Sequence, residues 1–202
     1  PYITSNGGGS TASISFSENS TANVTTVTSS DQDGNSIATY SISGVDAADF
    51  SINSSSGVLS FASTPDCENP HDDGANNEYI VIVTVTDNGS LTDNQTLTIT
   101  VTDVNEAPVI TSNGGGDTDS DSFAENSTSA VTTVTSTDVD AGDTATYSKS
   151  GADADNFTIN SSTGELTFVS APDYFVDTKP NTYLKILVVL PHRYLEPLEN
   201  AG

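Results

Sequence analysis

Hydrophobic residues occupy every second position along much of the first half of the chain. The alternation is longest over residues 79–85 and 97–101, and shorter runs surround Ile14 and Tyr40. A period of two predicts β-strands with one buried face, whereas a helix would need a period near 3.6. Clusters of Asp, Asn, Gly and Ser separate the runs and predict turns. About seven strands in about 105 residues are typical of an antiparallel Greek-key sandwich.

Two shorter segments refine this prediction. Residues 44–50 favour a single helical turn that places Phe50 in the core. Residues 53–57 form an Asn-Ser-Gly cluster that predicts a hairpin turn before Leu59 and Phe61.

The chain repeats itself. Residues 3–9 recur at residues 110–116, a shift of 107 positions. The same shift relates Glu18 to Glu125 and Asp66 to Asp173. A constant offset over most of a module indicates two tandem copies of one unit. We therefore predict an all-β protein of two tandem seven-stranded sandwiches, with repeat 1 at residues 1–106 and repeat 2 at residues 107–202.

The balance of charged residues limits the classes of partner that the protein can bind. The chain has 4 Lys and Arg against 28 Asp and Glu, a formal net charge of −24. This excess argues against binding nucleic acid or an anionic membrane surface, because both need basic residues. It fits a protein that binds divalent cations, or one that repulsion keeps soluble.

No arrangement of residues in the sequence predicts an enzyme. Cys67 is the single cysteine, so an intramolecular disulfide is excluded and a packed thiol is favoured. The glycine run at residues 7–9 lacks the lysine and the helix of a phosphate loop. Residues 117–121 alternate Asp with small polar residues but lack the glycine and glutamate of an EF-hand loop, so we expect a solvated acidic edge.

The segment 101–108 joins the two copies. It carries Asp103, Asn105 and Glu106 within four positions, and Pro108 then prevents strand pairing. Oxygen-bearing side chains so close together predict a calcium-binding hinge between the two sandwiches.

The motifs together resemble cadherin repeats, in particular the cadherin-like modules of large bacterial surface proteins. The likeness rests on Glu18-Asn19, Asp31-x-Asp33, residues 49–59, Pro65-Asp66-x-Glu68, Val85-Thr86-Asp87 and Asp103-x-Asn105-Glu106-x-Pro108. It covers copy 1 completely and copy 2 to about Tyr183. Cadherin repeats bind calcium at the junction of successive modules.

The resemblance implies a set of calcium ligands from three places in the chain. Repeat 1 would supply Glu18, Asp66 and Glu68, and the linker Asp103, Asn105 and Glu106 with backbone carbonyls of Val104 and Ala107. Repeat 2 would supply Asp138, Asp140 and a backbone carbonyl near Gly142. Two or three ions would neutralise the carboxylates. Turn formation alone is the alternative role for the Asp-x-Asp pairs.

Copy 2 departs from copy 1 at positions expected to be buried. Asp121, Lys149 and Lys185 stand where copy 1 has Ile14, Ile42 and Val81, and Pro191 stands where it has Asp87. We expect an irregular or truncated end after about residue 190, and weak calcium half-sites at the outer ends of both repeats.

The function expected from these features is a calcium-rigidified extracellular spacer or adhesion module of a larger cell-surface protein. Its partners would be calcium, neighbouring repeats of the same polypeptide, and another cell-surface protein or polysaccharide, but not nucleic acid. The alternative is an accessory module that binds a carbohydrate or protein ligand. The lack of Trp, with most Tyr and Phe at inward positions, weighs against a sugar site.

Overall fold

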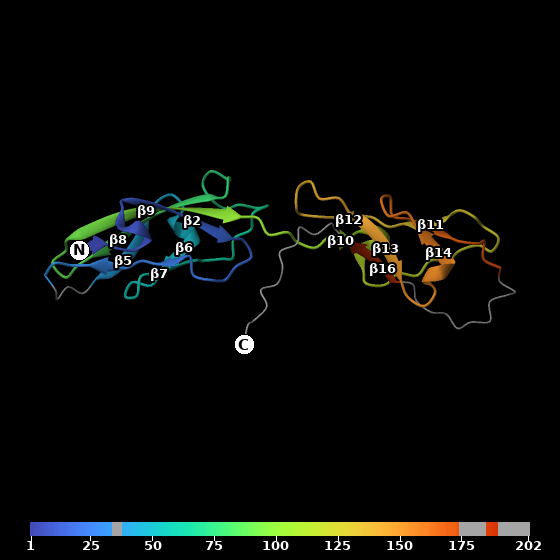
Figure 1. Ribbon diagram of the computed structural model, residues 1–202, viewed down its shortest axis with the longest axis horizontal. Helices are drawn as coiled ribbons and strands as arrows, with labels where there is room; N and C mark the ends of the chain where they lie inside the picture. The colour runs from blue at the N-terminus through green and yellow to red at the C-terminus, as the bar shows by residue number, and fades with distance from the viewer. Residues whose placement is uncertain (34–37, 174–184, 190–202) are drawn as a thin grey trace. The chain divides into compact units, whose positions relative to one another are not determined.

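The computed structural model describes residues 1–33 and 38–173, and the backbone of residues 185–189 (Figure 1). The chain divides into two compact units, unit 1 at residues 1–104 and unit 2 at residues 105–202. Both are built from strands joined by turns and short 3₁₀ segments, which confirms the all-β prediction.

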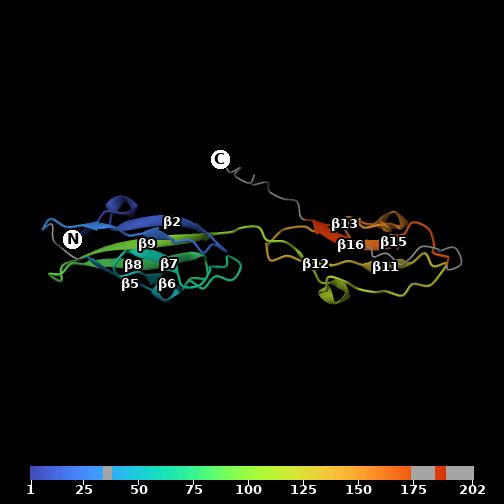
Figure 2. The same ribbon diagram turned by 90° about the horizontal axis from the view of Figure 1, so that it is seen from below.

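Unit 1 is a sandwich of two main sheets, whose strands are labelled in Figure 2. One sheet has the order β2-β9-β8-β5 and the other β3-β7-β6, while β1 pairs with β4. β2 runs parallel to β9, and the remaining pairs are antiparallel. The elements are β1 (Tyr2–Ile3), η1 (Asn6–Gly8), β2 (Thr11–Ser17), β3 (Thr25–Thr26), β4 (Ser29–Ser30), β5 (Thr39–Ser43), η2 (Ala47–Asp49), β6 (Phe50–Ile52), β7 (Val58–Phe61), β8 (Glu78–Thr86) and β9 (Thr92–Thr102).

The core of unit 1 lies where the alternation predicted it. The inward residues of β8 and β9 are almost completely buried, among them Val81, Val83, Leu97 and Ile99 at 0% exposure. The facing sheet contributes Phe50 and Leu59, and four aromatic rings pack together between the layers: Phe16, Phe50, Phe61 and Tyr79. Phe50 follows the single turn η2, as expected.

The predicted hairpin turn before β7 is tightly specified. Asn53 Oδ1 accepts the N–H groups of Ser55 and Ser56, and Gly57 N–H donates to Asn53 O at 2.9 Å. Gly57 has φ +71°, and a Cβ there would collide with the carbonyl of Val27. Glycine is therefore required both by the left-handed backbone and by the close approach of the neighbouring strand.

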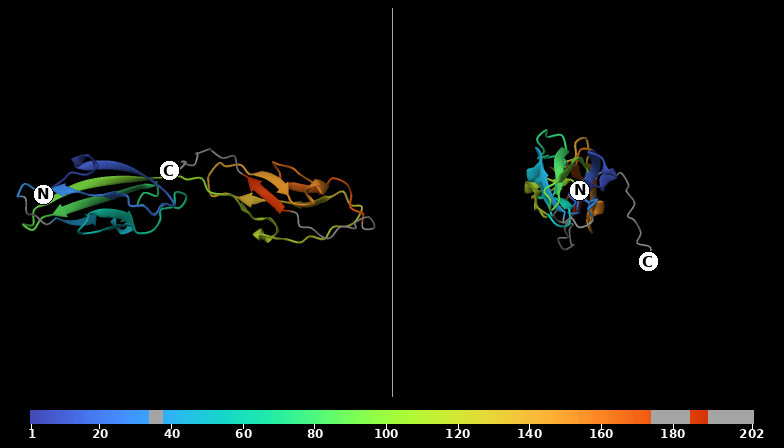
Figure 3. Two further views of the ribbon diagram at one scale, coloured as in Figure 1. Left: turned by 60° about the horizontal axis from the view of Figure 1, so that its bottom comes forward. Right: turned by 90° about the vertical axis from the view of Figure 1, so that its left-hand side faces the viewer.

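Unit 2 repeats part of this plan. Its sheets are β11-β15-β14, β13-β16 and β10-β12, and β16 (red in Figure 3) runs antiparallel to β13. The elements are β10 (Val109–Ile110), η3 (Ser112–Gly115), β11 (Ala130–Thr133), β12 (Ser136–Thr137), β13 (Thr146–Ser150), η4 (Ala154–Asn156), β14 (Phe157–Ile159), β15 (Glu165–Phe168) and β16 (Lys185–Val189).

The second strand of unit 1, β2, has no counterpart at the equivalent positions of unit 2. Residues 116–129 form no strand, and Asp121 is exposed rather than buried. Phe123 still packs against Phe168, with ring centroids 5.1 Å apart. The charge of Lys149 is accommodated because its Nζ donates to Ala154 O at 2.8 Å. The side chain of Lys185 and residues 190–202, including Pro191, lie outside the described residues.

Candidate metal centre

Glu18 is the most buried carboxylate of unit 1, at 2% exposure. It follows β2, and its N–H donates to Thr102 O at 3.0 Å. Its carboxylate accepts the N–H of Cys67 through Oε2 and that of Val104 through Oε1, each at 2.7 Å. The side chain therefore ties the loop after β7 to the segment that leaves β9.

Two further carboxylates lie beside Glu18. Glu68 and Asp103 are exposed residues, and each offers an oxygen within 4.8 Å of an oxygen of Glu18 and of each other. Carboxylates held this close repel one another unless a cation or protons neutralise them. The structure thus brings together three predicted ligands that are far apart in the sequence.

Asp66 is placed differently from the prediction. Its Oδ1 accepts the N–H groups of Glu68 and Asn69, both at 3.1 Å, in a local turn. Among the described residues it is outside the group of Glu18, Glu68 and Asp103. It borders a hollow of about 230 Å³ that Asp49 and Tyr79 also line.

Cys67 is a neighbour of the site that spacing alone did not reveal. Its Sγ lies within 4.8 Å of oxygens of Glu18 and Glu68, and Asn77 Nδ2 donates to it at 3.2 Å. Burial, followed by the charges of Glu18 and Glu68, raises the pKa of the Cys67 thiol. The group therefore stays a protonated thiol at neutral pH, as the packed-thiol prediction implies. Its position between Asp66 and Glu68 was the available signal.

Unit 2 contains the Asp138-x-Asp140 pair. Asp140 N–H donates to Asp138 Oδ1 at 3.0 Å, so one oxygen of Asp138 does form the turn. Asp140 is 8% exposed, and its Oδ2 accepts the N–H of Glu106 at 2.8 Å. Within the described residues, Asp138 Oδ2 and Asp140 Oδ1 are buried and have no hydrogen-bond partner. Turn formation therefore does not account for Asp138 Oδ2 and Asp140 Oδ1.

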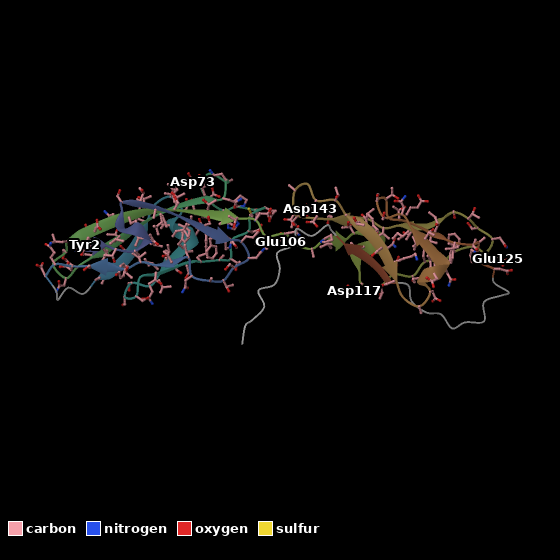
Figure 4. All side chains as sticks on the ribbon, in the orientation of Figure 1. Tyr2, Asp73, Glu106, Asp117, Glu125 and Asp143 are labelled. Carbon is pink, nitrogen blue, oxygen red and sulfur yellow. The ribbon has the colours of Figure 1, made fainter. Side chains whose placement is uncertain are left out.

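The remaining predicted ligands of the linker and of unit 2 occupy accessible backbone. Val104, Asn105 and Ala107 are exposed, and Glu106 (labelled in Figure 4) is half-buried. Asn105 Nδ2 donates to Glu106 O at 2.8 Å. Gly142, with φ +99°, is an exposed residue in the turn that Asp143 N–H closes onto Asp140 O.

The carboxylates expected to form the outer half-sites lie at Asp31 and Asp33 in unit 1 and at Glu125 in unit 2. Asp31 Oδ2 lies 2.8 Å from the amine of Pro1, and this hydrogen bond raises the pKa of the amine. Asp33 N–H donates to Asp31 Oδ1 at 2.9 Å, so this pair forms the same turn as Asp138 and Asp140. Glu125 is exposed at its loop in unit 2 (Figure 4).

The donor set has the chemistry of a calcium site. Calcium takes six to eight oxygens from carboxylates, carbonyls and amides, and tolerates irregular geometry. The carboxylates around Glu18 in unit 1 are oxygen donors of that kind, and so, within unit 2, are the Asp138 and Asp140 carboxylates and the amide of Asn105. Buried carboxylate oxygens without partners are costly, and a cation is the natural compensation. The residues of this chain therefore fit calcium.

Other candidate sites are weaker. Asp117, Asp119 and Asp121 are exposed, as expected for a solvated acidic edge. Across the described part of the chain, both groups of three or more potential metal ligands contain Glu18 and Glu68. Tyr40, Phe50 and Tyr79 are buried, which leaves them unable to stack on a sugar.

Comparison with known proteins relates both the sequence and the fold of this chain to cadherin domains. Residues 12–102 match the family model of the Cadherin domain. Cadherin domains are extracellular adhesion modules and not enzymes. No curated protein matches the sequence. In the described residues, no helix is long and apolar enough to cross a membrane.

Solved cadherin structures share the fold. Human protocadherin-24 EC1-2 has a TM-score of 0.58 at 21% identity, over 94% of each chain. Drosophila N-cadherin EC1-4 has a TM-score of 0.53 at 23% identity, over 88% of this chain and 46% of that chain. The cadherin resemblance is thus confirmed, while the bacterial surface type stays a prediction.

Proposed function

We propose that the chain is a calcium-binding, calcium-rigidified spacer and adhesion module of a larger cell-surface protein. The observation that carries this proposal is the pair of buried oxygens without partners, Asp138 Oδ2 and Asp140 Oδ1. Asp140 Oδ2 accepts the N–H of Glu106, so Asp138 and Asp140 lie beside the segment that begins unit 2.

The residues that would hold calcium come from both sides of the linker. Glu18, Glu68 and Asp103 supply carboxylates from unit 1, and Asp138 and Asp140 supply them from unit 2. Glu106 and Asn105 supply oxygens from the joining peptide, and Val104, Ala107 and Gly142 supply backbone carbonyls. Asp66 can add its second oxygen, because only its Oδ1 forms the local turn.

The mechanism is electrostatic. Bound calcium supplies the positive charge that these carboxylates lack. Without it, Asp103 and Glu68 repel Glu18, and the carboxylates of unit 2 repel those of the linker. No bound ion then restrains the conformation of the peptide at residues 104–108. With the charges neutralised, shared ligands restrict that peptide, and a string of such repeats becomes stiff enough to project from a surface.

The expected affinity is modest. Extracellular calcium modules bind with dissociation constants on the order of 10⁻⁴–10⁻³ M. Glu18 contributes less than a free carboxylate would, because both its oxygens already accept backbone N–H groups.

Small-angle scattering of the whole chain in calcium and in chelator tests the stiffening. We expect a narrower distribution of dimensions in calcium, and no such change for Asp140→Asn. The substitution keeps an acceptor for Glu106 N–H but removes the charge. Equal scattering of the wild type in both buffers would contradict the proposal.

A further inference from the structure

The hollow of about 230 Å³ in unit 1 is lined by η2, by the end of β7 with the residues after it, and by the loop that leads into β8. Its lining includes Asp49, Phe61, Asp66, Asn69, His71 and Tyr79. None of Glu18, Glu68 and Asp103 lines it. A hollow of this size admits one extended side chain or a small organic molecule, and its lining joins charged groups to aromatic ones.

Asp49 is a carboxylate that the fold holds in place without a hydrogen bond to its side chain. Its backbone is fixed, because Asp49 N–H donates to Asp46 O at 3.0 Å and Ala62 N–H donates to Asp49 O at 2.7 Å. In the part of the chain that the structure describes, no N–H or O–H group donates to the Asp49 carboxylate. Burial, followed by the charge of Asp46, raises its pKa. The charged form of Asp49 therefore lacks compensation.

Two neighbouring carboxylates strengthen the negative potential at this point. The charges of Asp46 and Asp72 both act on Asp49. Asp46 and Asp72 are 3% and 5% exposed, and backbone N–H groups bind the oxygens of both. A cation beside Asp49 is thus attracted by three carboxylates, and of these Asp49 is the one without a hydrogen bond.

Unit 2 has the same backbone without this charge. Asn156 stands at the position equivalent to Asp49, and its N–H donates to Asp153 O at 3.0 Å. Val169 N–H donates to Asn156 O at 2.9 Å, as Ala62 does to Asp49. The turn therefore forms without a carboxylate, and a carboxylate whose pKa is raised by burial lowers stability at neutral pH. A charge that the turn does not require and that costs stability points to a role in binding.

We propose that this hollow binds a primary alkylammonium group, such as a lysine side chain or a free diamine carries, with the ammonium on Asp49 and the methylene stem along Phe61. An ammonium has three N–H donors and no acceptor, so it suits a carboxylate that receives no hydrogen bond. The stem of such a ligand packs on an aromatic ring while its charge stays at the carboxylate.

A metal ion suits the hollow less well. Among the described residues, both groups of convergent metal ligands contain Glu18 and Glu68, and neither contains Asp49. An ammonium needs one carboxylate and an apolar wall, which the hollow has. Calcium takes no part in this binding, so the alkylammonium site and the calcium site can fail separately.

Methyl NMR of the whole chain, labelled with ¹³C at its alanine methyl groups, tests the proposal in chelator at pH 8. Imidazole groups are largely neutral at that pH and do not compete as cations. The probe is Nα-acetyl-lysine methylamide. We expect the methyl signals of Ala48 and Ala62, which line the hollow, to shift saturably. The dissociation constant should be on the order of 1–10 mM and should rise with salt.

Two controls isolate the charges. Asp49→Asn gives unit 1 the residue that unit 2 carries, so it should fold, and its affinity should fall by at least about tenfold. Asp73→Asn removes an exposed charge of the same unit (Figure 4), and its backbone N–H still binds Asp46. That variant should stay within about twofold of the wild type. Acetylation of the Nε of the probe removes the ligand's charge and should abolish the shifts.

Putrescine, a free diamine, distinguishes the two sources of an ammonium group. Asp66→Asn should weaken putrescine binding if its second ammonium reaches Asp66, and should leave the lysine derivative within about threefold. Tighter binding of the lysine derivative would assign the hollow to a lysine of a partner protein, and tighter binding of putrescine to free diamines. Either result supports the alkylammonium site. Unmoved Ala48 and Ala62 signals with both probes, or equal affinities of the wild type and Asp49→Asn, would overturn it.

Discussion

The sequence Glu-Asn-Ser-Thr occurs at residues 18–21 and again at residues 125–128. The two segments form the same turn, but their glutamates differ in burial. Asn19 and Asn126 have φ 57° and 60°, and their N–H groups donate to the carbonyls of Pro65 and Pro172. The turn is therefore the same. Glu18 is nonetheless buried, whereas Glu125 is exposed.

The difference lies in the segments around each glutamate. Glu18 is buried because the N–H groups of Cys67 and Val104 bind its carboxylate. Tyr174, the counterpart of Cys67, lies outside the described residues. The repeated motif thus forms the turn, whereas residues outside the motif bury the carboxylate of Glu18. The burial of Glu18 therefore depends on the segments that pack around it more than on the repeated motif.

The largest effect we expect tests what the units share. Gly57→Ala should destabilise unit 1, and Gly164→Ala unit 2, by about 3 kcal/mol or more. In each, the new Cβ would meet a carbonyl, that of Val27 or Val134, at a left-handed position. Calorimetric unfolding should show one transition lowered in each variant. Gly7→Ala, with positive φ but open space, is the control and should cost about 1 kcal/mol. Equal losses in all three would refute the packing of these turns.

The next effect tests what the units do not share. Glu18→Gln should lower the stability of unit 1 by about 2 kcal/mol in chelator, because an amide NH₂ would face a backbone N–H. Glu125→Gln, at the exposed counterpart, should stay within about 0.5 kcal/mol. Urea unfolding measures both. A similar cost for the two variants would show that the buried setting of Glu18 is wrong.

Calcium should then stabilise the chain by about 1.5–3 kcal/mol at a tenfold to hundredfold excess over the dissociation constant. Asp103→Ala with Glu106→Ala should abolish that gain, measured as the calcium-dependent rise in melting temperature. Asp117→Ala with Asp119→Ala removes two exposed carboxylates elsewhere and should preserve it. An undiminished rise in the first variant would place the ions elsewhere.

The smallest effect contrasts Asp49 with Asn156, its counterpart in unit 2. Burial, followed by the charge of Asp46, raises the pKa of Asp49. A pKa raised in the folded state means that stability declines as pH rises through the titration of Asp49. Asp49→Asn should therefore raise the melting temperature by about 1–3 °C at neutral pH. The gain should disappear below the pKa of an ordinary carboxyl, near about pH 3. A gain independent of pH would rule out the charge as its cause.

Much of unit 1 was predictable because its burial is periodic. The faces of β8 and β9, the turn before Phe50 and the hairpin at Asn53 all arise from local patterns. The opening segment of unit 2 was harder. Asp121 replaces Ile14 on a face expected to be buried, while the acidic run at residues 117–121 favoured a solvated edge. In the structure the strand is lost and the carboxylates of Asp119 and Asp121 are exposed, which agrees with the solvated acidic edge expected for residues 117–121.

The metal centre was predictable in part, through the resemblance to cadherin repeats. The resemblance implied Glu18, Glu68 and Asp103 as ligands, and these three do converge. Spacing could not show that Asp66 Oδ1 is engaged by its own turn, or that Asp138 keeps one oxygen without a partner. Such details depend on the distance between each carboxylate oxygen and the surrounding backbone N–H groups. That distance cannot be read from residue spacing.

Calorimetric titration of calcium into the wild type and into Asp140→Asn tests the central claim most directly. We predict binding to the wild type with a dissociation constant on the order of 10⁻⁴–10⁻³ M, and at least a roughly tenfold loss of affinity in the variant. Absence of binding heat in the wild type, or equal affinities in the two proteins, would contradict the account.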